Sequence, residues 1–327
     1  MDYRLPALTA GLLLAAFGIA RGLSGENPPA VAVQAPPQTM ARLPANAATH
    51  PNHRAGSQLI SDAIRQLSSH QTISAKVRHR TQMFDQRLVG SGLYLQKRMK
   101  PDPLVRFSLS VQSGERAVSL LHICDGRFLW IRENLDPPAS LSRIDLRRVR
   151  NASQPDRSET VLYSMTLGGG IVQLLKSLQA NFHFSEPYPL TFQQVPVWSL
   201  DCRWKPHRLK KLLPKHALFD EAGKLDVAEL PPQLPDHVFV LFGQDDLFPY
   251  HIDFRRSRSN RTKKEQPKKK SASLVTMELF EVQFDAPIQP SQFIYKPGDI
   301  EITDGTDDYI ARLQRFGART TRKSKKR

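Results

Sequence analysis

The sequence has no apolar run long enough to cross a membrane as a helix. A spanning helix needs about 20 apolar residues, and the run at residues 7–20 is shorter. Its length instead suits the apolar core of a secretory signal peptide, which has about 7–15 residues. Gly18 and Ala20 place small residues where a signal peptidase cleaves, and the absence of a following cysteine excludes lipidation there. We therefore expect residues 1–24 to be a signal peptide or an uncleaved N-terminal anchor.

Motifs that carry catalysis are also missing. The sequence contains no His-Glu-x-x-His zinc motif, no Gly-x-Ser-x-Gly elbow and no phosphate-binding loop. The glycines at residues 168–170 lack the Gly-Lys-Ser/Thr ending, so we interpret them as a hinge or a helix start. The sequence therefore predicts no enzyme, no cofactor and no metal site, since its histidines lack ligand spacing: His122, His183, His207, His216, His237 and His251.

Cysteine is scarce, with two in the chain. Cys124 and Cys202 lie on separate predicted strands, and they could pair in an oxidising compartment or remain two buried thiols. An acidic cluster near the end of the chain could attract calcium, but position 12 of such a loop is Arg315 and not Glu. Helix capping is the better interpretation of this cluster: Asp299, Glu301, Asp304, Asp307 and Asp308.

The chain has no net charge outside two segments. Its formal charge is +16; residues 255–270 hold nine basic residues and one Glu, and residues 311–327 hold eight basic residues and no acid. A nucleic-acid-binding domain carries its charge on a folded face with aromatic residues between the cations. Both basic segments instead have the composition of unfolded chain. We expect no specific nucleic acid partner, but a basic loop at residues 255–272 and a disordered tail at residues 317–327 that bind an anionic membrane surface.

The remaining chain changes character at residue 57. Residues 25–56 are rich in Pro and Ala without periodicity, which predicts a disordered linker. Apolar residues at helical spacing then predict an amphipathic helix over residues 57–69. Alternating patterns predict three strands after it, at residues 73–83, 88–97 and 104–111.

The chain is organised around two apolar runs joined at Asp125-Gly126. This pair accepts the positive φ angles of a type I′ turn, so residues 120–133 should form an antiparallel hairpin. Both faces of its second strand carry large apolar residues, so the hairpin needs cover on two sides, by more sheet and by helices. The two faces are Phe128, Trp130 and Arg132 on one side, and Arg127, Leu129, Ile131 and Glu133 on the other.

The second half of the sequence continues as a sheet with two helices. A leucine-rich helix is clearest at residues 171–178, and a final helix contains Tyr309, Ile310, Leu313 and Phe316, with Asp304 or Thr306 as its N-cap. The predicted strands are residues 141–146, 190–195, 197–204, 237–242, 250–256 and 273–284.

This succession resembles the family of periplasmic lipoprotein carriers and outer-membrane lipoprotein receptors, together with related sensors that bind lipoproteins or lipids. The resemblance covers about residues 57–316. Its most specific part is the combination of the hairpin Cys124-Asp-Gly-Arg-Phe-Leu-Trp-Ile131 with the closing segment Phe293-Ile-Tyr-Lys-Pro-Gly298. The basic loop, the basic tail and an insertion at residues 203–235 depart from the family pattern.

The resemblance implies an α+β domain over residues 57–316: an incomplete, open antiparallel barrel of about 10–11 strands, with helices covering the open face. It implies a monomeric, non-enzymatic protein of the periplasm that binds acyl chains of lipids or lipoproteins in an apolar cavity and could carry them between membranes. Arg98 lies near the position where such carriers have an arginine that ties the barrel to its helical lid. The candidate lining residues are Leu93, Leu95, Phe107, Leu109, Leu121, Phe128, Trp130, Leu174, Leu175 and Phe239.

Other interpretations stay open from the sequence. Each lining residue could be ordinary core, and Arg98 could be a solvated cation at a strand end. Two further functions remain: an envelope sensor or scaffold of the same fold that acts through a protein partner, and an unrecognised hydrolase. Lipid that purifies with the protein would favour the carrier, and a second folded domain would favour the sensor.

Overall fold

The computed structural model describes residues 53–83, 86–113, 116–134, 139–152, 170–213, 218–219, 225–231, 234–257 and 271–317. The predicted signal peptide, nearly all of the linker, residues 258–270 of the basic loop and residues 318–327 of the tail lie outside these ranges. No helix in the described part of the chain is long and apolar enough to cross a membrane.

The described strands form one 13-stranded sheet that is not closed, with the order β13-β6-β5-β4-β3-β2-β1-β12-β11-β10-β9-β7 and β8 also paired to β9. All pairs are antiparallel except β13 with β6. The sheet therefore confirms the large, open and mostly antiparallel architecture. The strands are β1 (Thr72–Met83), β2 (Gln86–Lys97), β3 (Leu104–Ser113), β4 (Arg116–Cys124), β5 (Phe128–Asn134), β6 (Ser140–Asp145), β7 (Phe182–Phe184), β8 (Tyr188–Phe192), β9 (Val195–Trp204), β10 (His237–Gly243), β11 (Pro249–Ser257), β12 (Ser271–Phe284) and β13 (Ile302–Asp304).

The predicted count of about 10–11 strands is too low. The three-residue strands β7 and β13 are too short to show an alternating pattern in the sequence. The helices of the described chain are α2 (His53–Ser69), α3 (Leu146–Ala152), α5 (Gly170–Asn181), α6 (Pro206–Leu212) and α7 (Thr306–Gly317), with short 3-10 helices η1 (Val227–Glu229) and η2 (Pro290–Phe293). Helix α2 begins four residues before the predicted start, inside the segment expected to be linker.

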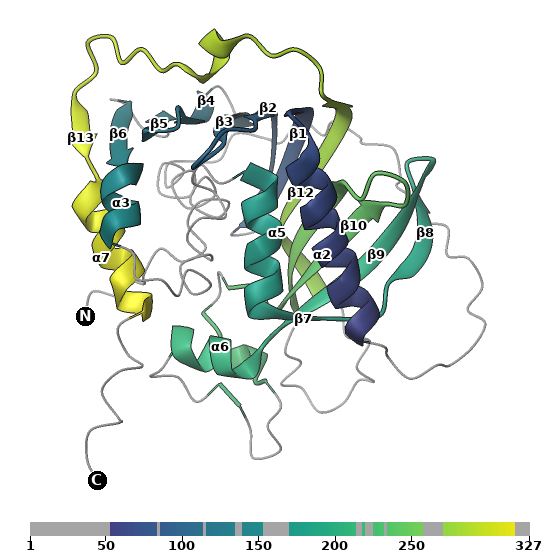
Figure 1. Ribbon diagram of the computed structural model, residues 1–327. Coiled ribbons are helices and arrows are strands. Elements are labelled where there is room, and N and C mark those ends of the chain that lie inside the picture. Colours follow the sequence, from purple (N-terminus) through teal and green to yellow (C-terminus); the bar gives the residue numbers. More distant parts are fainter. Residues whose placement is uncertain are drawn as a thin grey trace.

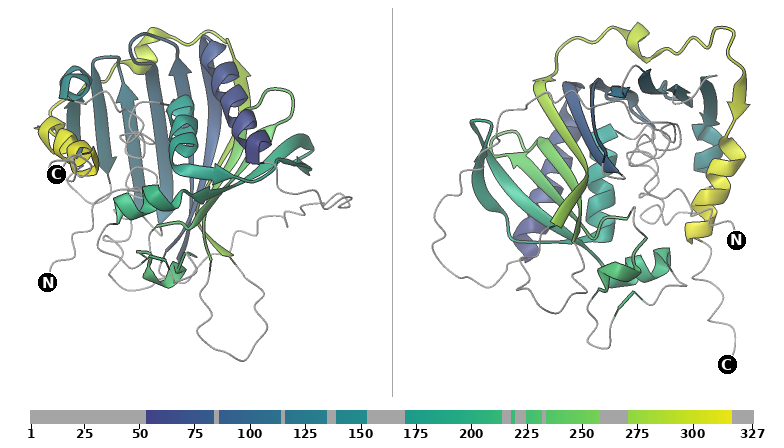
Figure 2. Two further views of the ribbon diagram at one scale, coloured as in Figure 1. Left: turned by 60° about the horizontal axis from the view of Figure 1, so that its bottom comes forward. Right: turned by 180° about the vertical axis from the view of Figure 1, so that it is seen from behind.

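Strand register divides the side chains of the sheet into two faces. Ala75 pairs with Tyr94, Tyr94 with Phe107, and Phe107 with His122, so these four side chains share one face. We call it the inner face, because buried side chains of α2 and α5 join Ala75 and Tyr94 in the main hydrophobic core. Figures 1 and 2 show α2 and α5 side by side on the concave side of the bent sheet. The opposite side is the outer face.

The central hairpin forms from β4 and β5, but its turn differs from the prediction. Asp125, Gly126 and Arg127 separate the strands, and only Gly126 among them has a positive φ, of 90°. The type I′ prediction is wrong because the Asp125 side chain closes the loop: Oδ1 accepts hydrogen bonds from the backbone N–H groups of Arg127 (2.9 Å) and Phe128 (2.6 Å). An aspartate that bonds its own loop does not need the left-handed backbone.

Both faces of this hairpin are covered, as predicted. On the inner face, Leu129 belongs to the main core and Ile131 packs against it. On the outer face, Ile123, Trp130 and Leu141 form a separate buried cluster. The alternation of side chains along β5 is therefore confirmed.

Residues 285–305, which we call the strap, supply the outer cover. The strap leaves β12 and passes over the outer side of the sheet to β13 (Figures 1 and 2). Tyr295 and Ile300 pack on the outer cluster around Trp130. The Arg106 guanidinium donates to the Gln292 carbonyl at 3.1 Å. The strap thus connects β12 to β13 at the far edge of the sheet, and α7 follows directly after it.

Asp304 of the strap and Asp307 of α7 lie at the N-terminus of helix α7. Asp304 Oδ1 accepts a hydrogen bond from the Thr306 backbone N–H at 2.9 Å, and Asp307 accepts one from the Arg148 guanidinium at 2.6 Å. Both contacts place negative charge at the N-terminus of α7, where the helix dipole favours it. The capping interpretation of the cluster is consistent with these contacts.

The basic loop is shorter than predicted. Strand β11 extends to Ser257 and β12 begins at Ser271, so Arg255 and Arg256 belong to the sheet. Arg255 forms an ion pair with Asp253 at 2.9 Å. Arg256 donates to the carbonyl oxygens of Val227 and Leu230. Both arginines therefore have structural partners, and residues 258–270 are what remains of the predicted basic loop.

Candidate functional site

The ten predicted lining residues do not lie on one surface. Phe107 and Leu109 are on the inner face of β3, and Leu174 and Leu175 are buried on α5. The other six pair with outward-facing residues of the neighbouring strands, so they lie on the outer face. These six are Leu93, Leu95, Leu121, Phe128, Trp130 and Phe239. Side chains one residue apart in a strand point to opposite sides, so the two sets cannot line a common cavity.

The six outward residues have other neighbours. Leu121, Phe128 and Trp130 belong to the outer cluster beneath the strap. Phe239 packs with Phe192, Val197 and Leu241 in a separate cluster on β8, β9 and β10. The apolar surface of these four residues meets the strap or neighbouring outer side chains, and Leu93 and Leu95 face the same outer side of the sheet.

The inner face carries a second apolar cluster, which we call the inner wall. Its buried members come from β3 and β4, and partly buried residues of β2, β3 and β5 pack against them. No helix within the described residues contributes to this cluster. Phe107 and Leu109 were predicted to line the site, and the alternation in residues 105–111 and 118–124 also marks Val111, Val118 and Leu120. The inner wall consists of Leu88, Phe107, Leu109, Val111, Val118, Leu120 and Ile131.

Helices α2 and α5 lie next to the inner wall, in the main core. Leu174 and Leu175 pack there with Ile60, Ala63 and Leu67 of α2. Leu175 is fully buried, so it is a core residue of the helix pair. Phe107 and Ile131 pack against both clusters, so the inner wall adjoins the ordinary core under the helices.

The N-terminus of α5 is held by the side chains of β2. The Tyr94 hydroxyl accepts a hydrogen bond from the Ile171 backbone N–H at 2.9 Å and donates to Gln96 Oε1 at 2.5 Å. Burial raises the pKa of Tyr94, so its hydroxyl stays protonated. Gly170 has a φ of 66°, and a Cβ there would lie 2.2 Å from Gln96 Oε1. The predicted role of this glycine as a helix start is confirmed.

The C-terminus of α5 is also bound by a polar side chain. Lys205 Nζ donates to the carbonyl oxygens of Gln179 (2.8 Å) and Ala180 (3.2 Å). A cation at a helix C-terminus is favourable because the last carbonyls have no partner within the helix. Polar contacts therefore fix both ends of α5.

Arg98 lies at the end of helix α2. Its guanidinium donates to the carbonyl oxygens of Ser68 (3.3 Å) and Ser69 (2.9 Å), and its backbone N–H donates to the Gln71 carbonyl at 2.7 Å. Arg98 thus connects the strand end of β2 to the last turn of the helix. The side chain is exposed, so water can compete for these contacts.

The connection from α2 to β1 has a second anchor. The Asp285 carboxylate accepts hydrogen bonds from the Gln71 backbone N–H (2.6 Å), and its other oxygen lies 2.8 Å from His70 Nδ1. These hydrogen bonds, that from His70 first, lower the pKa of Asp285. Arg98 and Asp285 therefore approach the end of α2 from two different strands.

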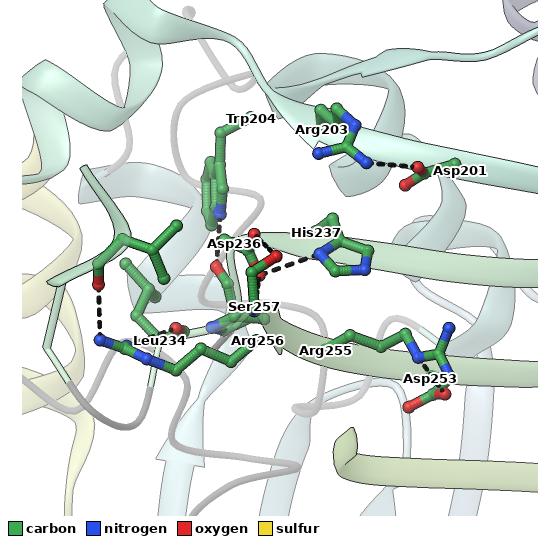
Figure 3. Close-up of polar contacts among 12 residues, drawn as sticks. Asp201, Arg203, Trp204, Leu234, Asp236, His237, Asp253, Arg255, Arg256 and Ser257 are labelled. Carbon is green, nitrogen blue, oxygen red and sulfur yellow. Dashed lines mark hydrogen bonds and ion pairs between the residues drawn. The ribbon is translucent and has the colours of Figure 1, made fainter. Parts of the chain in front are cut away.

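A buried polar cluster lies where β10 and β11 pair. Figure 3 shows the Asp236 carboxylate between His237 and Ser257. His237 Nδ1 lies 2.9 Å from Asp236 Oδ1, and the Ser257 hydroxyl donates to Asp236 Oδ2 at 2.8 Å. In a Ser-His-Asp nucleophile the histidine must accept the serine proton. Here the serine bonds the carboxylate directly, so these three residues are not arranged as a hydrolase triad.

The charge of Asp236 should make the stability of the protein depend on pH. Burial raises the pKa of Asp236, but hydrogen bonds from His237 and Ser257 together outweigh it and lower the pKa. A lowered pKa contributes stability above the unfolded value of about 3.9, and this stability is lost as the pH falls below it. We expect Asp236→Asn to cost about 2 kcal/mol at pH 7 and less near pH 3.5, as measured by urea unfolding. An equal cost at both pH values would contradict this account.

Both cysteines are buried free thiols. Burial raises the pKa of Cys124 to about 12 and raises that of Cys202 as well. Of the two alternatives left by the sequence, the structure therefore has two inert thiols and no disulfide between them.

Comparisons with known proteins give structural neighbours only. No protein-family model matches the chain, and no curated protein matches it. Among solved structures, it is similar to a putative outer-membrane lipoprotein-sorting protein domain from Vibrio parahaemolyticus, with 10% identity, 74% of this chain and 97% of that chain covered, and a TM-score of 0.32.

Two further neighbours are the lipoprotein LppX of Mycobacterium tuberculosis and the MucA/MucB complex of Pseudomonas aeruginosa. The LppX match has 10% identity, covers 71% of this chain and 96% of that chain, and has a TM-score of 0.35. The MucA/MucB match has 12% identity, covers 72% of this chain and 61% of that chain, and has a TM-score of 0.34.

Proposed function

We propose that this protein binds acyl chains of lipids or lipoproteins against the inner wall of its open sheet, as a non-enzymatic protein of the cell envelope. The observation that supports the proposal is the inner wall itself. Seven apolar side chains from four neighbouring strands form one surface on the concave side, and no described helix contributes to it.

The energetics suit an acyl ligand. Transfer of a methylene group from water to an apolar surface is worth about 0.8 kcal/mol, so a chain of a dozen carbons needs only apolar cover to bind. Branched and aromatic side chains such as Leu109, Leu120 and Phe107 provide such cover without any catalytic group. Of the ten residues predicted to line the site, Phe107 and Leu109 are kept in this proposal.

Helices α2 and α5 would act as the cover of the open face. The packed faces of both helices belong to the main core, so we place the movable part of this cover at the end of α2, where the contacts are polar and water can replace them. Arg98 makes these contacts, because it donates to two carbonyl oxygens from an exposed position. We assign it the lid-fixing role on this basis.

The basic loop and tail would bring the protein to an anionic membrane surface. Each lysine or arginine close to such a surface contributes about 1 kcal/mol, and added salt weakens the attraction. Residues 258–270 contain seven basic residues, and they join β11 to β12. Carriage of the acyl chains between membranes is compatible with such reversible attachment.

The alternative is an envelope sensor or scaffold that acts through a protein partner. One observation favours it: the strap exposes Ile294 at 58% of its surface, next to the buried Phe293 and the stacked Tyr295. An exposed apolar side chain on a segment held in place by its neighbours can be buried by another protein without reordering the segment. Absence of acyl binding under all conditions would make this the better account.

Replacement of Arg98 tests the proposed cover. We expect Arg98→Leu to keep the fold and to release a bound fluorescent fatty acid about three to ten times faster, because two charge-assisted bonds to the end of α2 are lost. Stopped-flow dissociation of the probe measures this rate. The matched control is Lys97→Leu, which removes the neighbouring charge and should leave the rate unchanged. Equal dissociation rates in Arg98→Leu and the wild type would show that Arg98 does not hold the cover closed.

A further inference from the structure

Glu133 is the one acidic residue on the inner face of β2–β6, among the positions whose side chains the structure describes. It lies near the end of β5, where it pairs with Leu120 of β4 and Ser140 of β6. Its inward neighbour on the same strand is Ile131. Leu120 and Ile131 both belong to the inner wall, so the carboxylate stands at the border of an apolar surface.

Among the described residues, none compensates the charge of Glu133. The side chain is partly buried, and no described residue gives its carboxylate a hydrogen bond or an ion pair. Burial raises its pKa. Arg132 and Arg143, on β5 and β6 beside Glu133, face outward with their strand partners. Among the described side chains, His122, which pairs with Ile131, is a titratable group on the same inner face.

A carboxylate in this position is costly for the protein alone and useful with a ligand. Apolar neighbours reduce its solvation, and a cation or hydrogen-bond donor brought by the ligand would restore the lost interactions. A ligand anion at the same place would be repelled. Between two amphiphiles with the same hydrocarbon chain, the Glu133 carboxylate therefore favours the one with a cationic headgroup over the one with an anionic headgroup.

We infer that Glu133 binds an amino group of the ligand, so that the preferred ligand is an acyl or alkyl chain with a cationic amine at its head. The chain lies on the inner wall, with the amine at Glu133 and the hydrocarbon running along β3 and β4 toward Phe107. The inference rests on the proposed function and narrows its ligand class.

The test compares dodecylamine with dodecanoic acid, both below their micelle concentrations and at physiological salt. Each displaces a bound fluorescent reporter from the full-length protein, and the ratio of their affinities is measured. We expect the wild type to bind the amine at least about ten times more tightly, and Glu133→Gln to bring the ratio close to one. The matched control Glu301→Gln, an exposed carboxyl on the strap, should keep the wild-type ratio.

The possible results separate the two claims. A ratio that is the same in the wild type and in Glu133→Gln overturns the inference but leaves acyl binding intact. Binding of neither compound, with no reporter uptake, overturns the proposed function itself. Thermal unfolding of Glu133→Gln, which preserves size and shape, verifies that the variant is folded before the ratio is compared.

Discussion

Replacement of Trp130 by alanine should destabilise the protein by about 3–5 kcal/mol, the cost of removing a large aromatic side chain from a packed cluster. Trp130 is only 9% exposed. Its ring stacks on Tyr295 of the strap at 5.4 Å and meets Phe128 edge-on at 5.9 Å. Its indole Nε1 also donates to Asp125 Oδ2 at 3.0 Å. The variant therefore loses the contact of the strap and one bond of the hairpin loop together.

Urea unfolding measures this loss, and limited proteolysis of residues 285–305 reports the strap separately. The matched control is Arg132→Ala, on the same face of β5 but exposed, which should change stability by less than about 0.5 kcal/mol. A cost below about 1 kcal/mol for Trp130→Ala would mean that the strap does not depend on the outer cluster.

Replacement of Arg256 by methionine should also destabilise the protein strongly, by about 3 kcal/mol. The partly buried guanidinium of Arg256 binds the long connection between β9 and β10. Figure 3 shows its side chain directed at this connection. It donates to the carbonyl oxygens of Pro231 (2.5 Å) and Leu234 (3.2 Å) with one nitrogen. With the other it donates to those of Val227 (2.7 Å) and Leu230 (2.8 Å).

Methionine keeps most of the apolar stem but leaves these carbonyls without their donor. We expect the change to appear in urea unfolding and as faster proteolysis around residues 225–236. Arg255→Met is the control: its side chain is 37% exposed, pairs with Asp253 and lies 5.9 Å from the Phe239 ring centroid, but holds no backbone carbonyl of this connection among the described residues, so its loss should cost less than about 1 kcal/mol. Equal costs for the two variants would show that the carbonyl contacts of Arg256 contribute nothing particular.

Local patterns predicted most of the fold. Alternation located the long strands from β1 to β5, and the hydrophobic period located α2 and α5. The turn of the central hairpin was mispredicted because Asp125 can act through its side chain as well as through its backbone. The short strands β7 and β13 were missed because three residues contain too little pattern to recognise.

The candidate site was harder to predict, for a physical reason. A strand with apolar residues on both sides, such as β5, does not reveal which side faces the helices. Only the register with neighbouring strands decides it, and that register placed Trp130 and Leu121 outside but Ile131 inside. Arg98 was selected through the family resemblance and not through periodicity, and its guanidinium donates to the last carbonyl oxygens of α2.

Photolabelling tests the central claim most directly. A fatty acid with a diazirine in its chain is bound to the protein and activated, and the labelled residues are identified by peptide mass spectrometry. We predict labels on inward residues of the inner wall, such as Leu109, Leu120 and Ile131, which an excess of unlabelled fatty acid prevents. Labels confined to outward residues such as Leu93 and Leu121, or none above the level with excess competitor, would contradict the proposed function.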